Sequence, residues 1–362
     1  MKVIVIGARG IPDYLGGVET HCQELYPRLV LLGCEVIVVR RSAYASDELS
    51  HGSKYMGVKL VDIYSPKIKS FEAIVHTFLA VLYARGQAVD IVHIHAIGPS
   101  LLTPLVRLLG MNVVSTNHGP DYDRHKWGWV AKKMLHAGEK FGALFSNKVI
   151  AISEVIQGIL KREYDVNADV IFNGVAHKKA VAPGAYLKTL GIRADTYVVA
   201  VGRFVEEKAL HDLIDAFSML GLLETKLVLV GDSDHQDEYC RMLKQKAKDA
   251  GVVLTGFISG DRLVEVFANA QLFVLPSYHE GLPIALLEAL GFSLPVLISD
   301  IDANKAIGLP ESDYFIKGNV PDLKEAIERK LAIDKKPNYQ QYLDKYDWDR
   351  IAMQTYELYQ RV

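Results

Sequence analysis

The chain has 362 residues, half of them hydrophobic, and this length favours two domains over one ordinary core. Its 41 basic and 43 acidic residues leave a net charge of −2, which gives no overall attraction to nucleic acid or to an anionic membrane. Three cysteines without metal-ligand spacing, and the lack of any signal-peptide or membrane-span pattern, indicate a cytoplasmic protein with reduced thiols.

The first half of the chain alternates apolar runs with helical periods, which predicts a parallel sheet covered on both faces. After an expected strand at 2–7, a long loop leads to Gly16 and Gly17, just before a helix. Their backbone amides can approach a phosphate or a sugar, because no side chain intervenes. The G-x-G-x-x-G spacing of a dinucleotide site is missing, and Arg40 and Arg41 stand where that site needs an acid.

Two histidines are expected at the carboxyl edge of this first sheet. His95 ends an expected strand at 90–95, and His118 follows another at 112–116. Functional groups collect at this edge of a parallel sheet. His118, directly before a glycine, is therefore a candidate site residue, although a solvated or structural histidine fits the same pattern.

A basic and aromatic segment from Arg124 to Lys133 contains two of the three tryptophans. One interpretation is the solvated start of a helix. The other is a peripheral contact with the inner face of a membrane, where a lipid-linked acceptor would be reached. The net charge argues against nucleic acid as the partner.

A second strand-and-helix pattern begins after residues 177–184, which are basic, lack an apolar period and are expected to link two domains. An expected strand at 197–202 ends in glycine and is followed by Arg203 and Lys208. This pair can clamp a diphosphate, since lysine supplies a point charge and arginine a fork of donors. Pairing with the neighbouring glutamates on the surface is the alternative.

The most informative stretch runs from Ser277 to Glu288, after an apolar strand at 272–276. Pro283 begins a helix, whose amino end can bind an anion. Glu280 in the turn and Glu288 in an otherwise apolar helix are placed to bond sugar and ribose hydroxyls. A buried carboxylate without a partner is costly, which favours this interpretation over that of two solvated glutamates.

Two doubly wound α/β domains are therefore expected, one over residues 1–175 and one over 185–346. Residues 347–362 are expected to pack back on the first. The last expected strand is 295–299, and an aromatic-rich helix pair follows from residue 338.

These motifs together resemble a known family over nearly the whole chain: the retaining glycosyltransferases of family four, among the group 1 glycosyl transferases, with the two-Rossmann fold called GT-B. The residues that carry the resemblance are Gly16-Gly17, His118-Gly119, Arg203-x4-Lys208 and Glu280-x7-Glu288. The chain is also similar to a bacterial branch that includes rhamnosyltransferases of surface-polysaccharide synthesis, through Gly7-Ala-Arg-Gly-Ile-Pro12 and Arg124-His-Lys-Trp127.

The resemblance implies two domains facing a central cleft. It also implies a metal-independent hexosyltransferase without a cofactor, which moves a sugar from a UDP-, dTDP- or GDP-linked donor to a saccharide or lipid-linked acceptor. Arg203 and Lys208 would hold the departing diphosphate, Glu288 the ribose, and Glu280 the donor sugar. By the same resemblance, Gly281 and Leu282, next to Pro283, would hold phosphate through their amides, Gly16 and Gly17 would approach the diphosphate, His118 would line the sugar site, and the base would lie near Phe257.

The sequence departs from the family at three points. Ala209 follows the lysine where glycine is usual, the loop 301–305 lacks the common Gly-Gly, and the bacterial branch usually lacks a histidine at the position of His118. Asp232-Ser-Asp234 is the only candidate for a metal-binding strand end. Alternative functions are a sugar-nucleotide epimerase or a phosphorylase on the same scaffold, an NAD-dependent oxidoreductase, and a non-catalytic sugar-binding protein. Base, sugar, acceptor and oligomeric state are not specified by the sequence.

Overall fold

The computed structural model describes residues 1–44, 52–66, 72–120, 122, 128–176, 181–233, 236–333 and 337–362. The chain divides into two compact units, one of Met1–Asn173 with Trp348–Val362 and one of Gly174–Asp347. The division between residues 173 and 174 precedes the expected linker at 177–184. Residues 177–180 of that linker lie outside the described residues.

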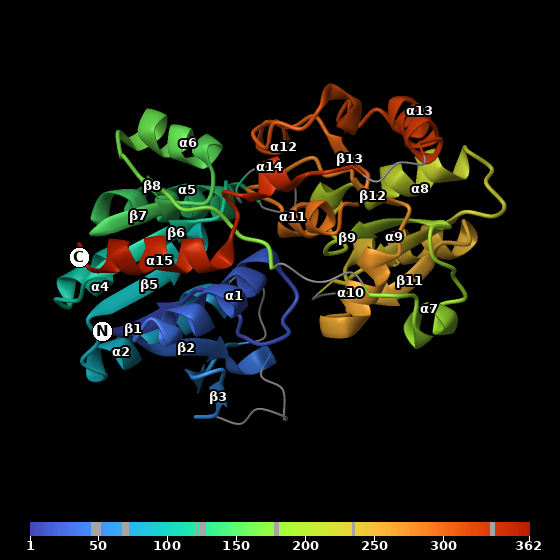
Figure 1. Ribbon diagram of the computed structural model, residues 1–362. Helices are drawn as coiled ribbons and strands as arrows, with labels where there is room; N and C mark the ends of the chain where they lie inside the picture. The colour runs from blue at the N-terminus through green and yellow to red at the C-terminus, as the bar shows by residue number, and fades with distance from the viewer. Residues whose placement is uncertain are drawn as a thin grey trace. The chain divides into compact units, whose positions relative to one another are not determined.

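The first unit contains an eight-stranded sheet in the order β3-β4-β2-β1-β5-β6-β7-β8 (Figure 1). All its pairs are parallel except β3 with β4. The strands are β1 (Lys2–Ile6), β2 (Glu35–Arg41), β3 (Lys54–Tyr55), β4 (Val58–Ile63), β5 (Ile91–His95), β6 (Val113–Asn117), β7 (Lys148–Ala151) and β8 (Asp169–Val170). The helices are α1 (Gly17–Leu31), α2 (Glu72–Gly86), α3 (Ile97–Ser100), α4 (Thr103–Leu108), α5 (Trp129–Phe145), α6 (Glu154–Tyr164) and α15 (Trp348–Tyr359).

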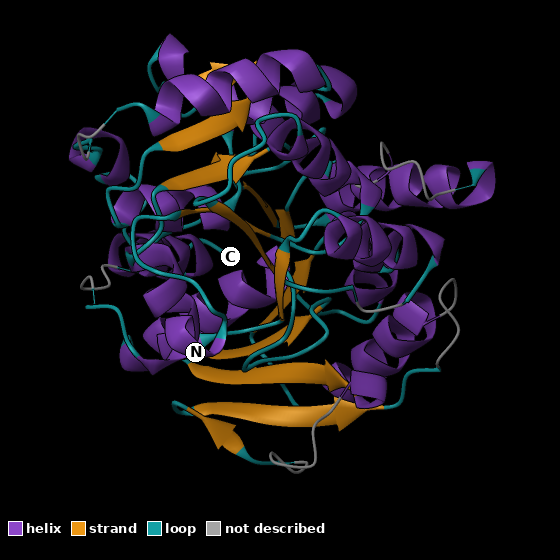
Figure 2. Ribbon diagram, turned by 90° about the vertical axis from the view of Figure 1, so that its right-hand side faces the viewer, coloured by secondary structure: helices purple, strands orange, loops and turns teal. Residues whose placement is uncertain are grey.

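The second unit contains a six-stranded, fully parallel sheet in the order β11-β10-β9-β12-β13-β14. Its strands are β9 (Tyr197–Val201), β10 (Lys226–Val230), β11 (Val253–Gly256), β12 (Leu272–Leu275), β13 (Val296–Ser299) and β14 (Tyr314–Phe315). Its helices are α7 (Ala185–Thr189), α8 (Leu210–Ser218), α9 (Glu238–Asp249), α10 (Gly260–Ala268), α11 (Ile284–Gly291), α12 (Asp302–Lys305), α13 (Val320–Leu331) and α14 (Gln340–Leu343). Figure 2 distinguishes these helices from the strands by colour.

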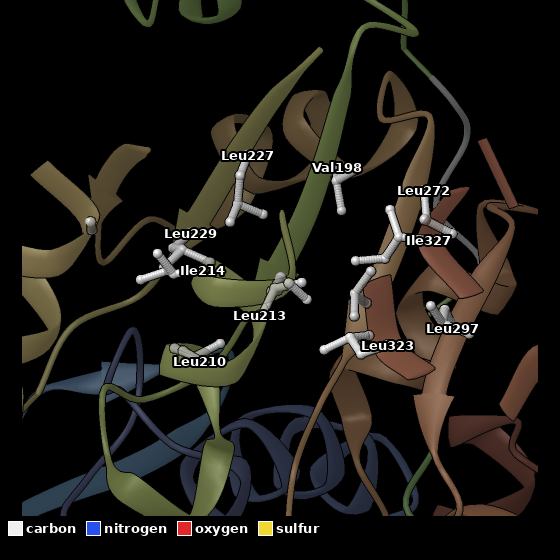
Figure 3. Packing of buried hydrophobic residues seen from close by; sticks show 14 of the residues in the cluster. Val198, Leu210, Leu213, Ile214, Leu227, Leu229, Leu272, Leu297, Leu323 and Ile327 are labelled. Atoms are coloured by element: carbon white, nitrogen blue, oxygen red, sulfur yellow. The ribbon is translucent and has the colours of Figure 1, made fainter. Parts of the chain in front are cut away.

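The core of the second unit explains why its strands read as unbroken apolar runs. Parallel strands are covered on both faces, so neither face keeps polar side chains. On one face, Leu213 of α8 and Leu323 of α13 pack over Val198 of β9 and its neighbours (Figure 3). The predicted doubly wound α/β architecture is thus confirmed in each unit.

Some expected elements differ from those observed. Residues 295–299 do not hold the last strand, because β14 pairs with β13 beyond it. A two-residue strand is too short to show an apolar pattern. The expected helix pair at the end is divided between the units, since α14 belongs to the second and α15 to the first.

In each sheet the strand order reverses at one strand. β1 lies between β2 and β5, and β9 lies between β10 and β12. Loops that leave neighbouring strands in opposite directions at this point open a crevice at the carboxyl edge, where ligands bind in doubly wound folds.

Helix α15 returns from the far end of the chain and packs against α1. Ile351 and Leu358 are fully buried there, and Trp348 is 2% exposed. The last described helix therefore contributes to the core of the first unit.

We predict that Leu358→Ala lowers the free energy of unfolding of the first unit by about 2–5 kcal/mol, because it leaves a cavity at a fully buried position of α15. Urea unfolding followed by tryptophan fluorescence measures this, since Trp127, Trp129 and Trp348 all fall within the first unit. Met353→Ala, at a side chain 42% exposed on the same helix, is the control and should change little. Equal effects of the two substitutions would contradict the packing described.

Candidate active site

An ion pair joins the turns that follow β9 and β12. Lys208 ends the 3-10 turn Glu206–Lys208, and Glu280 lies in the loop after β12, the strand beside β9. Lys208 Nζ donates to Glu280 Oε1 at 2.5 Å, and Ser277 Oγ donates to the same oxygen at 2.6 Å. The Glu280 side chain is only 8% exposed, so water screens this pair weakly.

Further hydrogen bonds hold these two turns together. Tyr278 donates its backbone N–H to the carbonyl of Glu207 at 2.9 Å, and its hydroxyl to Asp212 Oδ2 at 2.6 Å. Ala209, which precedes α8, adopts φ 48° and ψ 32°, a left-handed conformation that favours glycine. This is the position where the sequence departs from the family's usual glycine, and alanine takes up the same conformation.

The other predicted donor-site residues lie at the same edge of the second sheet. Arg203 follows β9 and is partly exposed, as is Glu288 within α11. The residues on either side of Glu288, Leu287 and Ala289, are fully buried, whereas Glu288 itself keeps part of its surface exposed. Gly281 and Leu282 lead to Pro283, which caps α11. The first amides of a helix can bind an anion, which makes this helix start a candidate anion site.

Phe257 lies farther along the same edge, directly after β11. Its side chain is 43% exposed and lines a hollow of about 400 Å³ together with Ile258, Ser259, Asp261 and Arg262. An aromatic face beside a hollow of this size can stack on a planar base. Asp234 of the Asp232-Ser-Asp234 motif lies outside the described residues, and Asp232 pairs with Lys244 at 2.7 Å.

In the first unit, Gly16 and Gly17 begin α1. Gly16 has φ 143°, a backbone conformation that favours glycine, and a Cβ added there would displace the end of the Glu19 side chain, whose Oε2 lies at 2.2 Å. Gly17 is exposed, with nothing within 4 Å of the position of an added Cβ. Its amide can therefore be reached by a ligand.

His118 belongs to a group of histidines at the carboxyl edge of the first sheet. His95 Nδ1 and His118 Nε2 are 3.0 Å apart, so one of them donates to the other. The Tyr26 hydroxyl bonds His95 Nε2 closely and lies 3.0 Å from His93 Nδ1. The structure thus brings together the two histidines, His95 and His118, that the sequence predicts at this edge.

The other members of this group were not predicted from the sequence. His93 and His95 are two residues apart on one strand and therefore share a face, where their rings stack at 4.3 Å. This spacing was the available signal. His21 on α1 bonds Asn173 Oδ1 through Nδ1 at 2.9 Å, and Tyr359 of α15 lies 2.5 Å from His93 Nδ1. The sequence does not show which helix residues reach a given strand.

Burial keeps these histidines neutral. It lowers the pKa of His21 to about 4 and that of His93 to about 3, while His93's pKa is also lowered by the neighbouring His21. The pKa values of His95 and His118 lie well below their usual range, through burial first and then through the other imidazoles. Within the described residues, His21, His95 and His118 form a group that could hold a metal ion, with one ring nitrogen of each lying within 4.8 Å of the others.

We predict that the first unit loses stability as the pH falls from about 6.5 toward 4. The unfolded histidines gain protons near pH 6.5 whereas the folded ones do not, so protons favour the unfolded state. Each such histidine lowers the free energy of unfolding by up to about 1.4 kcal/mol per pH unit in this window. Urea unfolding at pH 7.5 and pH 5, followed by tryptophan fluorescence, measures the slope.

The matched pair of variants is His93→Asn, in the buried group, and His136→Asn, at an exposed position of α5. His93→Asn should reduce the pH slope and His136→Asn should keep it. An unchanged slope in His93→Asn would show that this buried ring does not contribute.

Comparison with known families gives a match in each unit. The model of Glycosyl transferases group 1 matches residues 188–346, and that of Glycosyltransferase Family 4 matches residues 15–179. The chain belongs to the GT-B glycosyltransferases. A match in each unit confirms the resemblance at the level of family and fold.

Individual relatives of this glycosyltransferase span its whole length. A glycosyltransferase of Methanocaldococcus jannaschii is 24% identical over 394 residues, which cover 99% of this chain and 98% of the relative. Sucrose-phosphate synthase from Thermosynechococcus elongatus shares the fold with a TM-score of 0.83, at 20% identity, over 99% of this chain and 98% of its own. Anabaena HepE in complex with UDP and glucose has a TM-score of 0.80 at 16% identity, over 100% of both chains.

The glycosyltransferase also has no helix, in the parts of the chain that are described, with the length and apolar character needed to cross a membrane.

Proposed function

We propose that this glycosyltransferase moves a sugar from a nucleotide-diphosphate donor to a saccharide or lipid-linked acceptor, with retention of configuration at the anomeric carbon. Supporting this is the contact between Lys208 and Glu280 at the point where the second sheet reverses its strand order. A sugar nucleotide has a charged diphosphate and a neutral sugar. The cation suits the diphosphate, and the carboxylate suits the hydroxyl groups of the sugar. The structurally similar HepE binds UDP and glucose.

In this proposal the side chains that bind the donor diphosphate come from the second unit. Arg203 and Lys208 supply positive charge, and the amides of Gly281 and Leu282 add hydrogen-bond donors at the start of α11. An ammonium group has three donors, and Glu280 takes one of them. The same cations stabilise the diphosphate as it leaves, so the transfer requires no metal ion and no cofactor.

Glu280 and Glu288 complete the proposed donor site. Glu280 is oriented by Lys208 and Ser277, which leaves its second oxygen for a sugar hydroxyl. Glu288, on the next turns of α11, would accept hydrogen bonds from the ribose. The hollow beside Phe257 would take the base of a UDP, dTDP or GDP donor.

The first unit would contribute Gly16 and Gly17 to the diphosphate and His118 to the sugar. The glycine amides can approach a phosphate, and His118 offers a neutral ring at a partly exposed position. The family assignment favours transfer over the epimerase, phosphorylase and oxidoreductase alternatives. At the end of β2, where an NAD site places a ribose-binding acid, this chain has Arg40 and Arg41, which pair with Asp62 and Glu72 at 2.7 and 2.8 Å.

We predict that Lys208→Ala weakens binding of UDP, GDP or dTDP, whichever binds the wild type, by at least about tenfold, because a charge-assisted hydrogen bond contributes about 1.5–3 kcal/mol. Isothermal titration calorimetry measures this without knowledge of the acceptor. Transfer should fall by about 100-fold or more, since the leaving charge loses its partner. Glu288→Gln should also abolish transfer while leaving the fold intact.

Lys246→Ala is the control, because Lys246 is paired with Asp215 at 2.5 Å on the surface of the same unit. It should bind nucleotide and transfer sugar as the wild type does, and chelation of metal ions with EDTA should not lower the wild-type rate. Near wild-type binding and transfer by Lys208→Ala would mean that the donor binds elsewhere.

Helix α5 supports a lipid-linked acceptor. It buries Gly138 and Glu139 on one side and exposes large apolar side chains on another. Lysines lie along the same exposed surface, as expected of a helix that rests in a membrane interface. The exposed residues are Trp129, Val130, Lys133, Met134, Lys140, Leu144 and Phe145. The segment Arg124–Trp127, which was expected to take part, lies outside the described residues.

We predict that Met134→Asp with Leu144→Asp lowers co-sedimentation with vesicles of phosphatidylglycerol and phosphatidylcholine by at least about tenfold, because two apolar anchors become charged. Raising the salt concentration should also weaken wild-type binding. Met219→Asp, at a side chain 62% exposed in the second unit, is the matched control. Equal vesicle binding by all three proteins would contradict a role for α5.

A further inference from the structure

Three histidines of the first unit form an arrangement that the proposed sugar transfer does not explain. His21, on α1, has its Nε2 atom buried without a hydrogen-bond partner, and the residue is 2% exposed. Its other nitrogen, Nδ1, bonds Asn173 Oδ1 at 2.9 Å. An amide oxygen only accepts, so Nδ1 carries the proton and Nε2 carries the unused lone pair.

His95, like His21, has one ring nitrogen bonded to an oxygen and its other nitrogen nearer the group. The Tyr26 hydroxyl bonds His95 Nε2, which leaves Nδ1 of His95 facing His118. A ligating histidine commonly donates its other N–H to an oxygen that orients the ring. Asn173 and Tyr26 are placed to accept these hydrogen bonds from His21 and His95, respectively.

The spacing of the rings fits a tetrahedral ion. The ring centres are 5.1 Å apart for His21 and His118, 5.3 Å for His95 and His118, and 5.4 Å for His21 and His95. Zinc–nitrogen bonds of about 2.0–2.1 Å at tetrahedral angles place imidazole centres about 5 Å from each other. The rings therefore already stand at the required separation.

We propose that His21, His95 and His118 form a binding site for a divalent transition-metal ion of the zinc class. Loading requires the rings to rotate so that the three lone pairs converge, because the ligand nitrogens now lie within 4.8 Å of one another and a tetrahedral ion needs about 3.4 Å. The ion displaces the proton shared by His95 and His118. His118 is partly exposed, which gives the ion an entry path and a fourth position for water.

Binding of this ion would also regulate transfer, an expectation that rests on the proposed function. His118 cannot hold a metal and line the sugar site with the same nitrogen. Occupancy is therefore expected to inhibit transfer, whereas the metal-free enzyme is the active form.

Cobalt(II) titration of the full chain, after removal of metal ions, tests the site directly. We expect one equivalent of Co²⁺ to produce the visible absorption of a tetrahedral complex, and Zn²⁺ to remove it by competition. His21→Asn and His118→Asn should each weaken Co²⁺ binding by at least tenfold. His76→Asn is the control, at a fully buried histidine of the same unit outside the group, and should bind as the wild type does.

X-ray absorption of the zinc-loaded wild type makes the test independent of how the variants fold. Three imidazole nitrogens at about 2.0–2.1 Å are expected. No stoichiometric Co²⁺ binding, a shell with fewer than two imidazoles, or full binding by folded His21→Asn would overturn the site. If Co²⁺ binds as expected but transfer is unaffected, the metal site stands and the assignment of His118 to the sugar site fails.

Discussion

Partly burying a lysine beside a buried glutamate side chain is tolerable only if each is held against the other, because either charge alone is costly to remove from water. Lys208 and Glu280 are 72 residues apart in the chain. They meet because β9 and β12 are neighbours in the sheet, and Tyr278 fastens the two following turns to each other. The candidate donor site thus depends on strand order. In a sheet where another strand separated β9 from β12, Lys208 and Glu280 would each lose the other as a partner.

The first unit avoids the cost of buried charge at its own strand-order reversal, because the groups there are neutral. Its reversal edge carries imidazoles and tyrosine hydroxyls, which hydrogen-bond one another except at His21 Nε2 and carry no charge at neutral pH. The two units therefore offer different chemistry. One edge has charge suited to an anion, and the other has uncharged donors and acceptors suited to hydroxyl groups or, through free lone pairs, to a metal ion.

The secondary structure and the fold class could be predicted from the sequence, because each element has a signal within a few neighbouring residues. The strand at 272–275, the turn after it and the start of α11 each have a signal within a few residues: an apolar run, glycine and proline, and an apolar helical period. The fold class followed because such units alternate along the chain. The pairing of Lys208 with Glu280 was not predictable in detail, since nothing local fixes which strands are neighbours. The same applies to His21, which reaches His95 only through the packing of α1 on the sheet.

The way α15 completes the first unit has a consequence for biosynthesis. Tyr359 bonds a histidine 266 residues earlier, and Trp348 covers His21. While the ribosome is still producing the second unit, α1 is exposed along the surface that α15 will later cover, and the imidazole group is open to water. A fragment ending at the boundary near residue 173 would remain in that condition. The first unit is therefore synthesised first but completes its folding last, after α15 has been made. An isolated first unit needs residues 348–359 supplied by fusion or as a peptide.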